Sequence, residues 1–327
     1  LLLSKSLPGP LATICTGRQS LRSSPTHLAM AGPPKFDLQD GKVVSTTNLC
    51  AGSKLLRVQA DSGSVQYEPG HVLALSIPKD GTEDKEGEGE NKGKHGDGLK
   101  GPYTVTRGDK EQGTFDVVYR VIKGGRLSRR LATLNKGAPI SFGGKFHVPI
   151  AAGISPSASS ICLISTGVGL GPVLGYVEQA EREGESRQTQ VYAGFRSVED
   201  VIFEPEFEQI AKESGGRVQF KTCISELRDE RYPPPPGYEG LRGRVTDAVP
   251  KVFSPSELSS THFHLIGNGA MVKTMQAALT RAGVPDDHVT IEIYFNHKAD
   301  VSDWEAEEVS RRLQQPAESA EWVGAES

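Results

Sequence analysis

The sequence of 327 residues lacks any apolar run that approaches the length of a membrane span, so no integral membrane protein is expected. Its four cysteines, Cys15, Cys50, Cys162 and Cys223, are widely scattered and form no metal-ligand or redox pair, which favours a reduced compartment. The net charge of −4 argues against a nucleic-acid-binding protein, because such proteins present a clustered positive face. The chain is long enough for two domains, and its 36% hydrophobic and 24% charged residues predict a globular fold.

Acidic residues are absent from residues 1–34, which are rich in serine, threonine and alanine and contain three basic residues. This composition is typical of an organelle transit peptide. It predicts a plastid location, with a mitochondrion as the alternative. An ordinary disordered leader is the other interpretation.

Residues 35–150 show short strands separated by turns, which predict a small antiparallel β-barrel. The clearest runs are LLRVQAD, HVLALSI, GPYTVTR, TFDVVYRVI and APISFGG. Residues 79–100 are glycine-rich and charged and have nothing to bury, so they are expected to form a flexible insertion between two strands.

Residues 151–296 change to alternating strands and helices, which predict an α/β domain with a parallel sheet. Its strands are expected at ICLIS, QVYAGF, RVQFKTCI, FHLIG and VTIEIYF, with one helix beginning near Gly243 and another at Ala270. Residues 297–327 are interpreted as an acidic C-terminal tail in which residues 303–313 can form a helix.

The stretch at residues 161–177, ICLISTGVGLGPVLGYV, is an apolar strand that breaks into glycine where a helix begins. Free N–H groups at that helix end and the helix dipole favour an anion, and Gly167, Gly169 and Gly171 would let a phosphate approach the backbone. Alone, such a turn is a weak signal, because many α/β proteins use one to change direction.

Several motifs in order resemble the ferredoxin–NADP reductase family, over about residues 35–296. They are YEPGHVLAL at 67–75, GPYT at 101–104, VIKGGRLSRRL at 121–131, STGVGLGP at 165–172, GNGAM at 267–271 and IEIYF at 291–295. The resemblance implies an FAD-binding β-barrel followed by a Rossmann-like NAD(P)-binding domain, and hydride transfer from NADPH to FAD.

By this resemblance Tyr103 and Tyr294, with Phe295, cover the two faces of the flavin ring, and Thr104 donates to its N5 atom. Glu292 would be the carboxylate beside the nicotinamide, which helps to move protons. The turn that would hold the FAD pyrophosphate contains Gly125, Arg126, Leu127 and Ser128. From the residues alone, the alternatives are an ordinary strand aromatic for Tyr103, which the adjacent Thr104 disfavours, and a solvent-facing residue of an edge strand for Glu292.

The resemblance places the nicotinamide nucleotide at two strand-to-helix turns, formed by Thr166, Gly167, Gly169, Pro172, Gly267, Asn268 and Met271. Met271 is equally well explained as a core residue. Arg196 follows the second strand, where an arginine suits the 2′-phosphate of NADP, and Arg228 would join it. Glu226 falls between the family's serine and arginine positions, so NAD stays open as the alternative dinucleotide.

Two positions depart from the family. Gly101 stands where an arginine clamps the FAD pyrophosphate, so flavin binding is expected to weaken unless Lys100, Arg107 or Arg126 replaces that contact. Ile266 stands where a cysteine lies close to the nicotinamide, and its bulk is expected to alter the geometry of hydride transfer.

Residues 120–145 contain seven basic residues and no acid: Arg120, Lys123, Arg126, Arg129, Arg130, Lys136 and Lys145. One interpretation is a sheet edge protected by charge, and the other is an anion site with a landing surface for an acidic carrier such as ferredoxin. A quinone or haem acceptor is an alternative. A non-enzymatic interpretation also stays open, in which a reductase-like fold acts as a binding or assembly subunit in peripheral association with an electron-transport complex.

Overall fold

The computed structural model describes residues 37–78, 98–229, 231–236 and 238–317. From Asp37 onward the chain forms one compact unit. The predicted transit peptide at residues 1–34 and residues 79–97 of the predicted insertion lie outside the described part. Residues 98–100 do not belong to the insertion, because they pair with a neighbouring barrel strand from Gly98 onward. In the described ranges no helix combines the length and apolar character of a membrane span.

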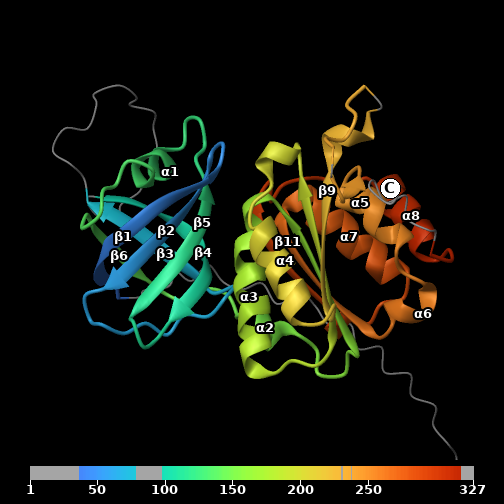
Figure 1. Cartoon of the computed structure of the whole chain (residues 1–327), viewed down its shortest axis with the longest axis horizontal. Coiled ribbons are helices and arrows are strands. Elements are labelled where there is room, and N and C mark those ends of the chain that lie inside the picture. The colour runs from blue at the N-terminus through green and yellow to red at the C-terminus, as the bar shows by residue number, and fades with distance from the viewer. Residues whose placement is uncertain (1–36, 79–97, 230, 237, 318–327) are drawn as a thin grey trace, which may run out of the picture. The chain divides into compact units, whose positions relative to one another are not determined.

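Six antiparallel strands close a β-barrel in the order β1-β2-β5-β4-β3-β6 (Figure 1). They are β1 (Gln39–Cys50), β2 (Ser53–Ala60), β3 (Val72–Pro78), β4 (Gly98–Asp109), β5 (Thr114–Arg120) and β6 (Pro139–Gly143). Side chains alternate in and out, so that Leu56 and Val58 of β2 are fully buried while Arg57 points outward. The interior is filled by aromatic and branched residues, with the Phe115 and Phe142 rings 4.7 Å apart.

Barrel closure bears on one interpretation of the basic residues around Arg120, the charge-protected sheet edge. Strand β5 pairs with β2 on one side and with β4 on the other, so it has no free edge. The sheet-edge interpretation is therefore wrong for this strand. A short helix, α1 (Arg126–Leu131), follows β5 and carries three of the basic residues.

The α/β domain is a six-stranded parallel sheet in the order β10-β9-β8-β7-β11-β12. Its strands are β7 (Ser160–Thr166), β8 (Gln188–Phe195), β9 (Val218–Ile224), β10 (Leu241–Arg242), β11 (Thr261–Asn268) and β12 (Val289–Phe295). The larger helices are α3 (Leu170–Glu183), α4 (Glu204–Glu213), α7 (Gly269–Arg281) and α8 (Asp303–Leu313). The predicted architecture, a barrel followed by a parallel α/β domain, is confirmed.

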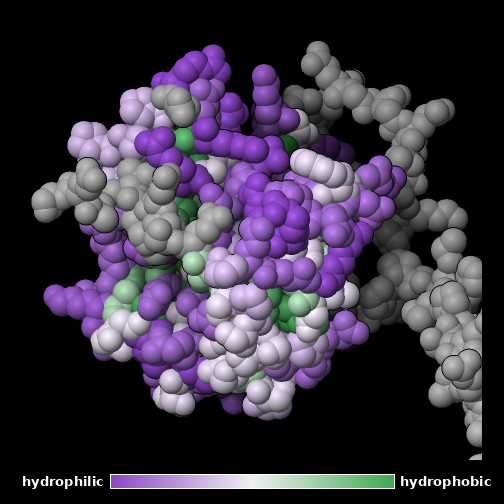
Figure 2. Space-filling model, turned by 90° about the vertical axis from the view of Figure 1, so that its right-hand side faces the viewer, coloured by the Kyte–Doolittle hydropathy of each residue, from purple (hydrophilic) through white to green (hydrophobic). Residues whose placement is uncertain are grey.

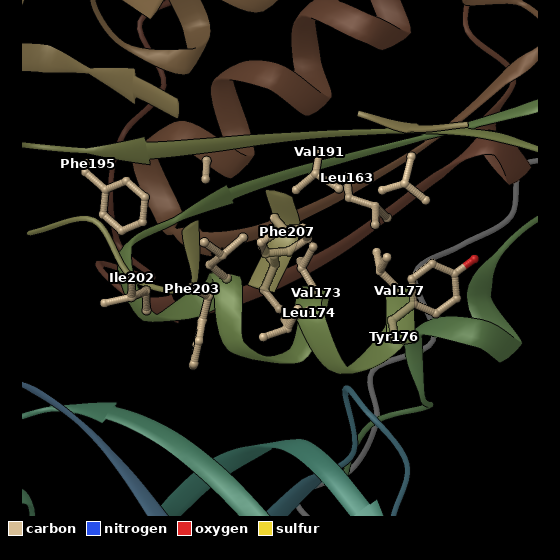
Figure 3. Close-up of a cluster of buried hydrophobic side chains, with 14 of the residues drawn as sticks. Leu163, Val173, Leu174, Tyr176, Val177, Val191, Phe195, Ile202, Phe203 and Phe207 are labelled. Atoms are coloured by element: carbon tan, nitrogen blue, oxygen red, sulfur yellow. The ribbon is translucent and has the colours of Figure 1, made fainter. Parts of the chain in front are cut away.

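Both faces of this sheet are buried, which is why its strands are continuously apolar. Leu163 of β7 and Val191 of β8 point toward α3 and α4, and Figure 3 shows them facing Val173, Val177 and Phe207. The alternate residues Cys162 and Ile164 pack on the other face with residues of α7 and α8. One sheet thus separates two hydrophobic cores.

The helix expected near Gly243 is replaced by short pieces. They are α5 (Val245–Ala248), a 3₁₀ turn at Val249–Lys251, and α6 (Pro255–Leu258). Pro250 and Pro255 lack the N–H that a continuous helix would need, which explains the breaks. Another four-residue helix, α2 (Ile150–Gly153), links the barrel to β7.

Residues 297–317 are not a tail, and this part of the sequence interpretation is corrected. Helix α8 covers residues 303–313 as expected, but it buries Ala306, Val309 and Leu313 against the core beside α7. Lys273 Nζ donates to the carbonyl oxygens of His297 and Ala299 at 2.7 and 2.8 Å and so fixes the connection. Figure 2 shows that the side of the molecule on which α8 lies in Figure 1 is mainly hydrophilic.

Helix α3 is also the contact between the α/β domain and the barrel. A Cβ atom on Gly175 would lie 1.7 Å from the Thr106 carbonyl oxygen of β4, so only glycine allows this close approach. The Arg107 guanidinium donates to both carboxylate oxygens of Glu178 at 2.5 and 2.7 Å. Strand β4 and helix α3 are therefore held by backbone packing and a two-point ion pair together.

Candidate active site

A cavity of about 1430 Å³ is lined jointly by barrel residues and by residues at the carboxyl ends of the parallel strands. Ligands of open α/β sheets bind at this end of the strands. Ten predicted site residues line it: Tyr103, Thr104, Ser128, Thr166, Gly167, Arg196, Asn268, Met271, Glu292 and Tyr294. Seven do not: Gly125, Arg126, Leu127, Gly169, Pro172, Arg228 and Gly267.

The two sides of the cavity meet at a buried hydrogen bond. Thr104 Oγ1 of β4 donates to Glu292 Oε1 of β12 at 2.6 Å, across 188 residues of sequence. Both side chains are more than nine-tenths buried. Glu292 lies on the edge strand, but it is not the solvent-facing residue that an edge position alone suggested.

Burial raises the pKa of Glu292 to about 7, because a carboxylate loses hydration in this site. The Thr104 hydroxyl partly offsets this by stabilising the charged form, as does the charge of His147. The second carboxyl oxygen, Oε2, is buried and has no hydrogen-bond partner among the described residues. A carboxyl group with a pKa near neutrality can both take up and release a proton.

Two tyrosines line the same cavity as this carboxyl group. Tyr103 precedes Thr104 on β4 and meets the Tyr119 ring edge to face at a centroid distance of 6.1 Å. Burial raises the Tyr103 pKa to about 12 and the Tyr294 pKa well above its usual value, so both are neutral phenols. Phe295, the next residue after Tyr294, also lines the cavity and is 51% exposed.

The first strand-to-helix turn contributes Thr166, Gly167 and Val168 to the cavity wall. Gly167 has a φ of +56°, a left-handed conformation, and the space beside it is open. No side chain caps the helical residues that follow. This end of the turn has open space beside backbone N–H groups, on which the predicted anion site depends.

The other glycines of the turn have a different role. A Cβ atom on Gly169 would lie 3.1 Å from the Ile266 carbonyl oxygen, and one on Gly171 would lie 2.7 Å from Thr106 Oγ1. These glycines allow close packing on β11 and on the barrel, and neither lines the cavity. The expectation that Gly169 and Gly171 open the backbone to an anion is therefore wrong, because the missing Cβ atoms serve packing.

The second turn is tied to the first by side chains. Thr166 Oγ1 accepts from the Asn268 N–H at 2.9 Å, and the Asn268 side chain accepts from the Ala270 N–H at the start of α7. Met271 is 8% exposed, belongs to the hydrophobic core and touches the cavity, so both interpretations of it apply. Ile266 is fully buried in the core and does not line the cavity.

The turn at residues 122–128 closes on itself. Ser128 Oγ accepts from the Ile122 N–H at 3.1 Å, and Ser128 alone of the four predicted pyrophosphate residues lines the cavity. Gly101 stands where the family has an arginine. A Cβ atom on Gly101 would lie 2.9 Å from Leu127 Cδ2, so the Leu127 side chain occupies the space that a side chain at this position would need. Arg107 is engaged by Glu178 and Asp116, which removes it as a replacement for the missing arginine.

Arg196 and Arg228 meet in a second, smaller cavity of about 470 Å³, which Arg196 and Ser225 share with the main one. Each arginine faces an acid: Arg196 Nε lies 2.7 Å from Glu226 Oε1, and Arg228 Nη1 lies 3.8 Å from Asp247 Oδ2. The positive charge at this corner is therefore partly neutralised.

The sequence interpretation did not identify several cavity residues, because no motif contains them. His147 follows the last barrel strand, residues 244–246 begin a short helix, and His297 and Glu305 come from the segment taken for a tail. The glycine pair before Phe146 and His147 marks a turn after a barrel strand, and this was the available signal for that loop.

Known proteins resemble this chain in sequence and in fold. Residues 163–277 match the oxidoreductase NAD-binding domain. Ferredoxin–NADP reductase B of Sorangium cellulosum is 25% identical over 241 residues, which cover 72% of this chain and 88% of that protein. NADH-cytochrome b5 reductase 1 of Aspergillus terreus is 29% identical over 188 residues, covering 55% of this chain and 60% of that protein. The chain is thus similar to FAD- and NAD(P)-binding oxidoreductases of the ferredoxin–NADP reductase and cytochrome b5 reductase type.

A solved structure supports the same architecture. The ferredoxin NADP⁺ reductase from Neisseria gonorrhoeae, crystallised with FAD and NADP, superimposes with a TM-score of 0.61 at 18% identity. The match covers 80% of this chain and all of that one. The matched NAD-binding domain and these relatives agree with the NAD(P)H-dependent oxidoreductase that the sequence motifs predicted.

Proposed function

We propose that the main cavity binds FAD against the barrel and NADPH against the α/β domain, and that the enzyme passes electrons singly to an acidic protein carrier. The observation that carries this proposal is the Thr104–Glu292 hydrogen bond, which puts a hydroxyl donor and a proton-accepting carboxyl group at the meeting point of the two sides. Tyr103 and Tyr294 line the same cavity and supply flat aromatic surfaces, which suit stacking on a flavin ring. When bound, FAD supplies the hydride acceptor and the one-electron chemistry.

On the barrel side, Tyr103, Thr104 and Ser128 would contact the flavin nucleotide. The turn at residues 122–128 and α1 add positive charge for its pyrophosphate. Leu127 occupies the space where the family's arginine would lie, so this contact must come from the turn itself.

On the α/β side, Thr166, Gly167 and Asn268 would hold the nicotinamide end of the dinucleotide. Arg196 and Arg228 with Ser225 would hold a 2′-phosphate, which favours NADPH over NADH. Glu226 opposes this, since its carboxylate pairs with Arg196 and would repel the phosphate.

The Glu226→Gln variant separates the two dinucleotides. It should tighten NADPH and leave NADH unchanged, because it removes a negative charge only from the 2′-phosphate corner. Equal effects on both KM values would contradict the assignment of this corner.

For the acceptor, the basic residues of segment 120–145 support a negatively charged protein. Arg120 and Lys123 line the cavity, and Ile122 and Phe146 beside them are 59% and 42% exposed. Exposed apolar residues ringed by charge are typical of transient docking sites. Relatives are named for ferredoxin and for cytochrome b5, so a protein electron carrier fits better than a quinone.

The acceptor side is tested by salt and by charge reversal. The rate with ferredoxin should fall with ionic strength, and Arg129→Glu plus Arg130→Glu should lower it further. Lys110→Glu is the matched control, because it is exposed at the opposite end of β5. A rate indifferent to salt and to the double variant would exclude an acidic carrier at this surface.

We also infer a plastid location from the acid-free composition of residues 1–34. Fusion of these residues to a fluorescent protein tests it, and a cytosolic signal would refute it.

The decisive experiment is the visible absorbance spectrum of the purified chain, with and without added FAD, followed by anaerobic NADPH. A flavin spectrum that bleaches on NADPH addition is expected. Absence of flavin binding even at high FAD would overturn the proposal and favour the non-enzymatic assembly subunit.

A further inference from the structure

The two carboxyl oxygens of Glu292 have different surroundings. Oε1 accepts the hydrogen bond of Thr104, whereas Oε2 is buried without a partner among the described residues. Leaving a buried polar atom unpaired costs roughly 1–3 kcal/mol, so such atoms in native proteins usually serve a purpose. Oε2 is therefore the atom that is free to take up and release a proton.

His147 lies on the same cavity, half-buried in the loop after β6. The loop is fixed by a backbone hydrogen bond, in which the Phe146 N–H donates to the Val72 carbonyl oxygen at 2.9 Å. Val72 in turn pairs directly with Thr104 in the barrel. This chain of contacts places His147 close to the residue that holds Glu292.

The ring of His147 has one nitrogen available. Nδ1 lies 2.9 Å from the Val148 carbonyl oxygen, so in the neutral ring Nδ1 carries the proton and Nε2 the lone pair, and uptake of a proton at Nε2 makes the ring a positively charged imidazolium. The ionisable groups near it are Lys145 of the same loop, His71 before β3, His264 of β11, and Glu292 of β12. His264 is fully buried and its pKa is lowered to about 3, so it stays neutral and does not compete for the proton.

We propose that His147 carries protons between Glu292 and solvent. The proposal rests on the function proposed above and adds to it. Oxidation of one NADPH, with delivery of its hydride as two single electrons, liberates one proton. Glu292 takes this proton as the carboxylate becomes a carboxylic acid, and passes it from Oε2 to the imidazole of His147 through water in the cavity, because no described side chain lies within hydrogen-bond distance of Oε2. The imidazolium then releases it to water, which restores both groups.

The coupling is tested first on the flavin-free protein, by an infrared titration of the Glu292 carboxyl band. Replacing His147 by glutamine should raise the Glu292 pKa, because a nearby positive charge is lost. His297→Gln is the matched control, since His297 is an exposed histidine on the same cavity, and it should leave the titration unchanged. An unchanged Glu292 titration in His147→Gln overturns the proposal.

The second test uses the FAD-loaded enzyme and single turnovers with a one-electron acceptor. His147→Ala should slow the proton-linked step by roughly tenfold or more, raise its solvent isotope effect, and be rescued by added imidazole. Loss of activity without rescue, at unchanged thermal stability, overturns the relay. Failure to bind FAD would overturn the proposed function, while the titration would still decide whether His147 and Glu292 are coupled.

Discussion

At the scale of single residues, the family resemblance assigned Thr104 and Glu292 to one site although they are 188 residues apart, but it did not predict that they share a 2.6 Å hydrogen bond. The same motifs misassigned Gly171, because a glycine-rich turn does not reveal which of its glycines faces the ligand and which faces a neighbouring element. His147 was missed because its position depends on a loop that only the folded barrel defines.

Thr104→Val should destabilise the protein more as pH rises. Valine keeps the shape but removes the donor to Glu292, so the Glu292 pKa rises further above its value of about 7. Above that pH the folded state must bury a carboxylate without a partner, at a cost of about 1–3 kcal/mol.

Urea unfolding at pH 5, 6.5 and 8 measures this effect. Thr104→Ser keeps the hydroxyl and should follow the wild type. A loss of stability that is the same at all three pH values would show that the hydrogen bond does not control the ionisation of Glu292.

At the scale of elements, the sequence predicted most strands and the larger helices, since their apolar periodicity is strong. It did not single out β1, whose residues QDGKVVSTTNLC are largely polar and carry little β signal. It also took the segment after β12 for a tail, because the acidic face of α8 hides three buried apolar residues. The composition of such an amphipathic helix gives only a weak signal in the sequence. The helix is recognised once the structure shows which core residues it covers.

Leu313→Ala should cost about 2–5 kcal/mol of unfolding free energy, because Leu313 is fully buried beside α7. Trp304→Ala on the same helix is the control, since Trp304 is 75% exposed, and should change stability by no more than about 0.5 kcal/mol. Chemical denaturation of both variants distinguishes a structural helix from an appended one, for which neither substitution would matter.

Gly175→Ala should destabilise the contact of α3 with the barrel by about 3 kcal/mol, despite the higher helix propensity of alanine. The new methyl group would meet the Thr106 backbone, which cannot move aside as a side chain can.

Gly171→Ala should cost less than Gly175→Ala, because its nearest neighbours are the side chains of Thr106 and Val118. The melting temperatures of the two variants, measured by thermal unfolding, show which substitution is more destabilising. The reverse order would show that α3 and β4 can separate at little cost.

At the scale of the whole molecule, the order of the motifs predicted the fold class. It did not predict which polar side chains are buried. His262 and His264 both lie within 2.9 Å of Thr290 Oγ1, and burial lowers their pKa values to about 4 and about 3. Nothing in the sequence marks these histidines as buried. They link β11 to β12 away from the cavity.

Stability should therefore fall as pH drops below about 6.5, where histidines of the unfolded chain take up protons that the folded chain refuses. Each of these two histidines contributes a loss of roughly 1 kcal/mol per pH unit down to its folded pKa. Glu292 acts in the opposite direction between about pH 7 and 4.5, because its raised pKa means that the folded state binds the proton first.

Glu292→Gln should thus steepen the acid loss, and His264→Gln should flatten it. Urea midpoints between pH 5 and 6.5 measure both slopes, in a range where ordinary carboxyl groups are still ionised. Parallel curves for the three proteins would contradict these ionisation states.

Strand β4 presents Tyr103 and Thr104 to the cavity, and within four residues it locks onto α3 through Thr106 and Arg107. The cavity wall at Tyr103 and Thr104 and the contact between the two domains are therefore parts of the same continuous strand. A hinge opening would have to break the Arg107–Glu178 ion pair and lift Gly175 off the backbone. Exchange of dinucleotides is then expected to proceed by rotation of single rings, such as the half-exposed Phe295, within a frame that stays closed throughout the catalytic cycle.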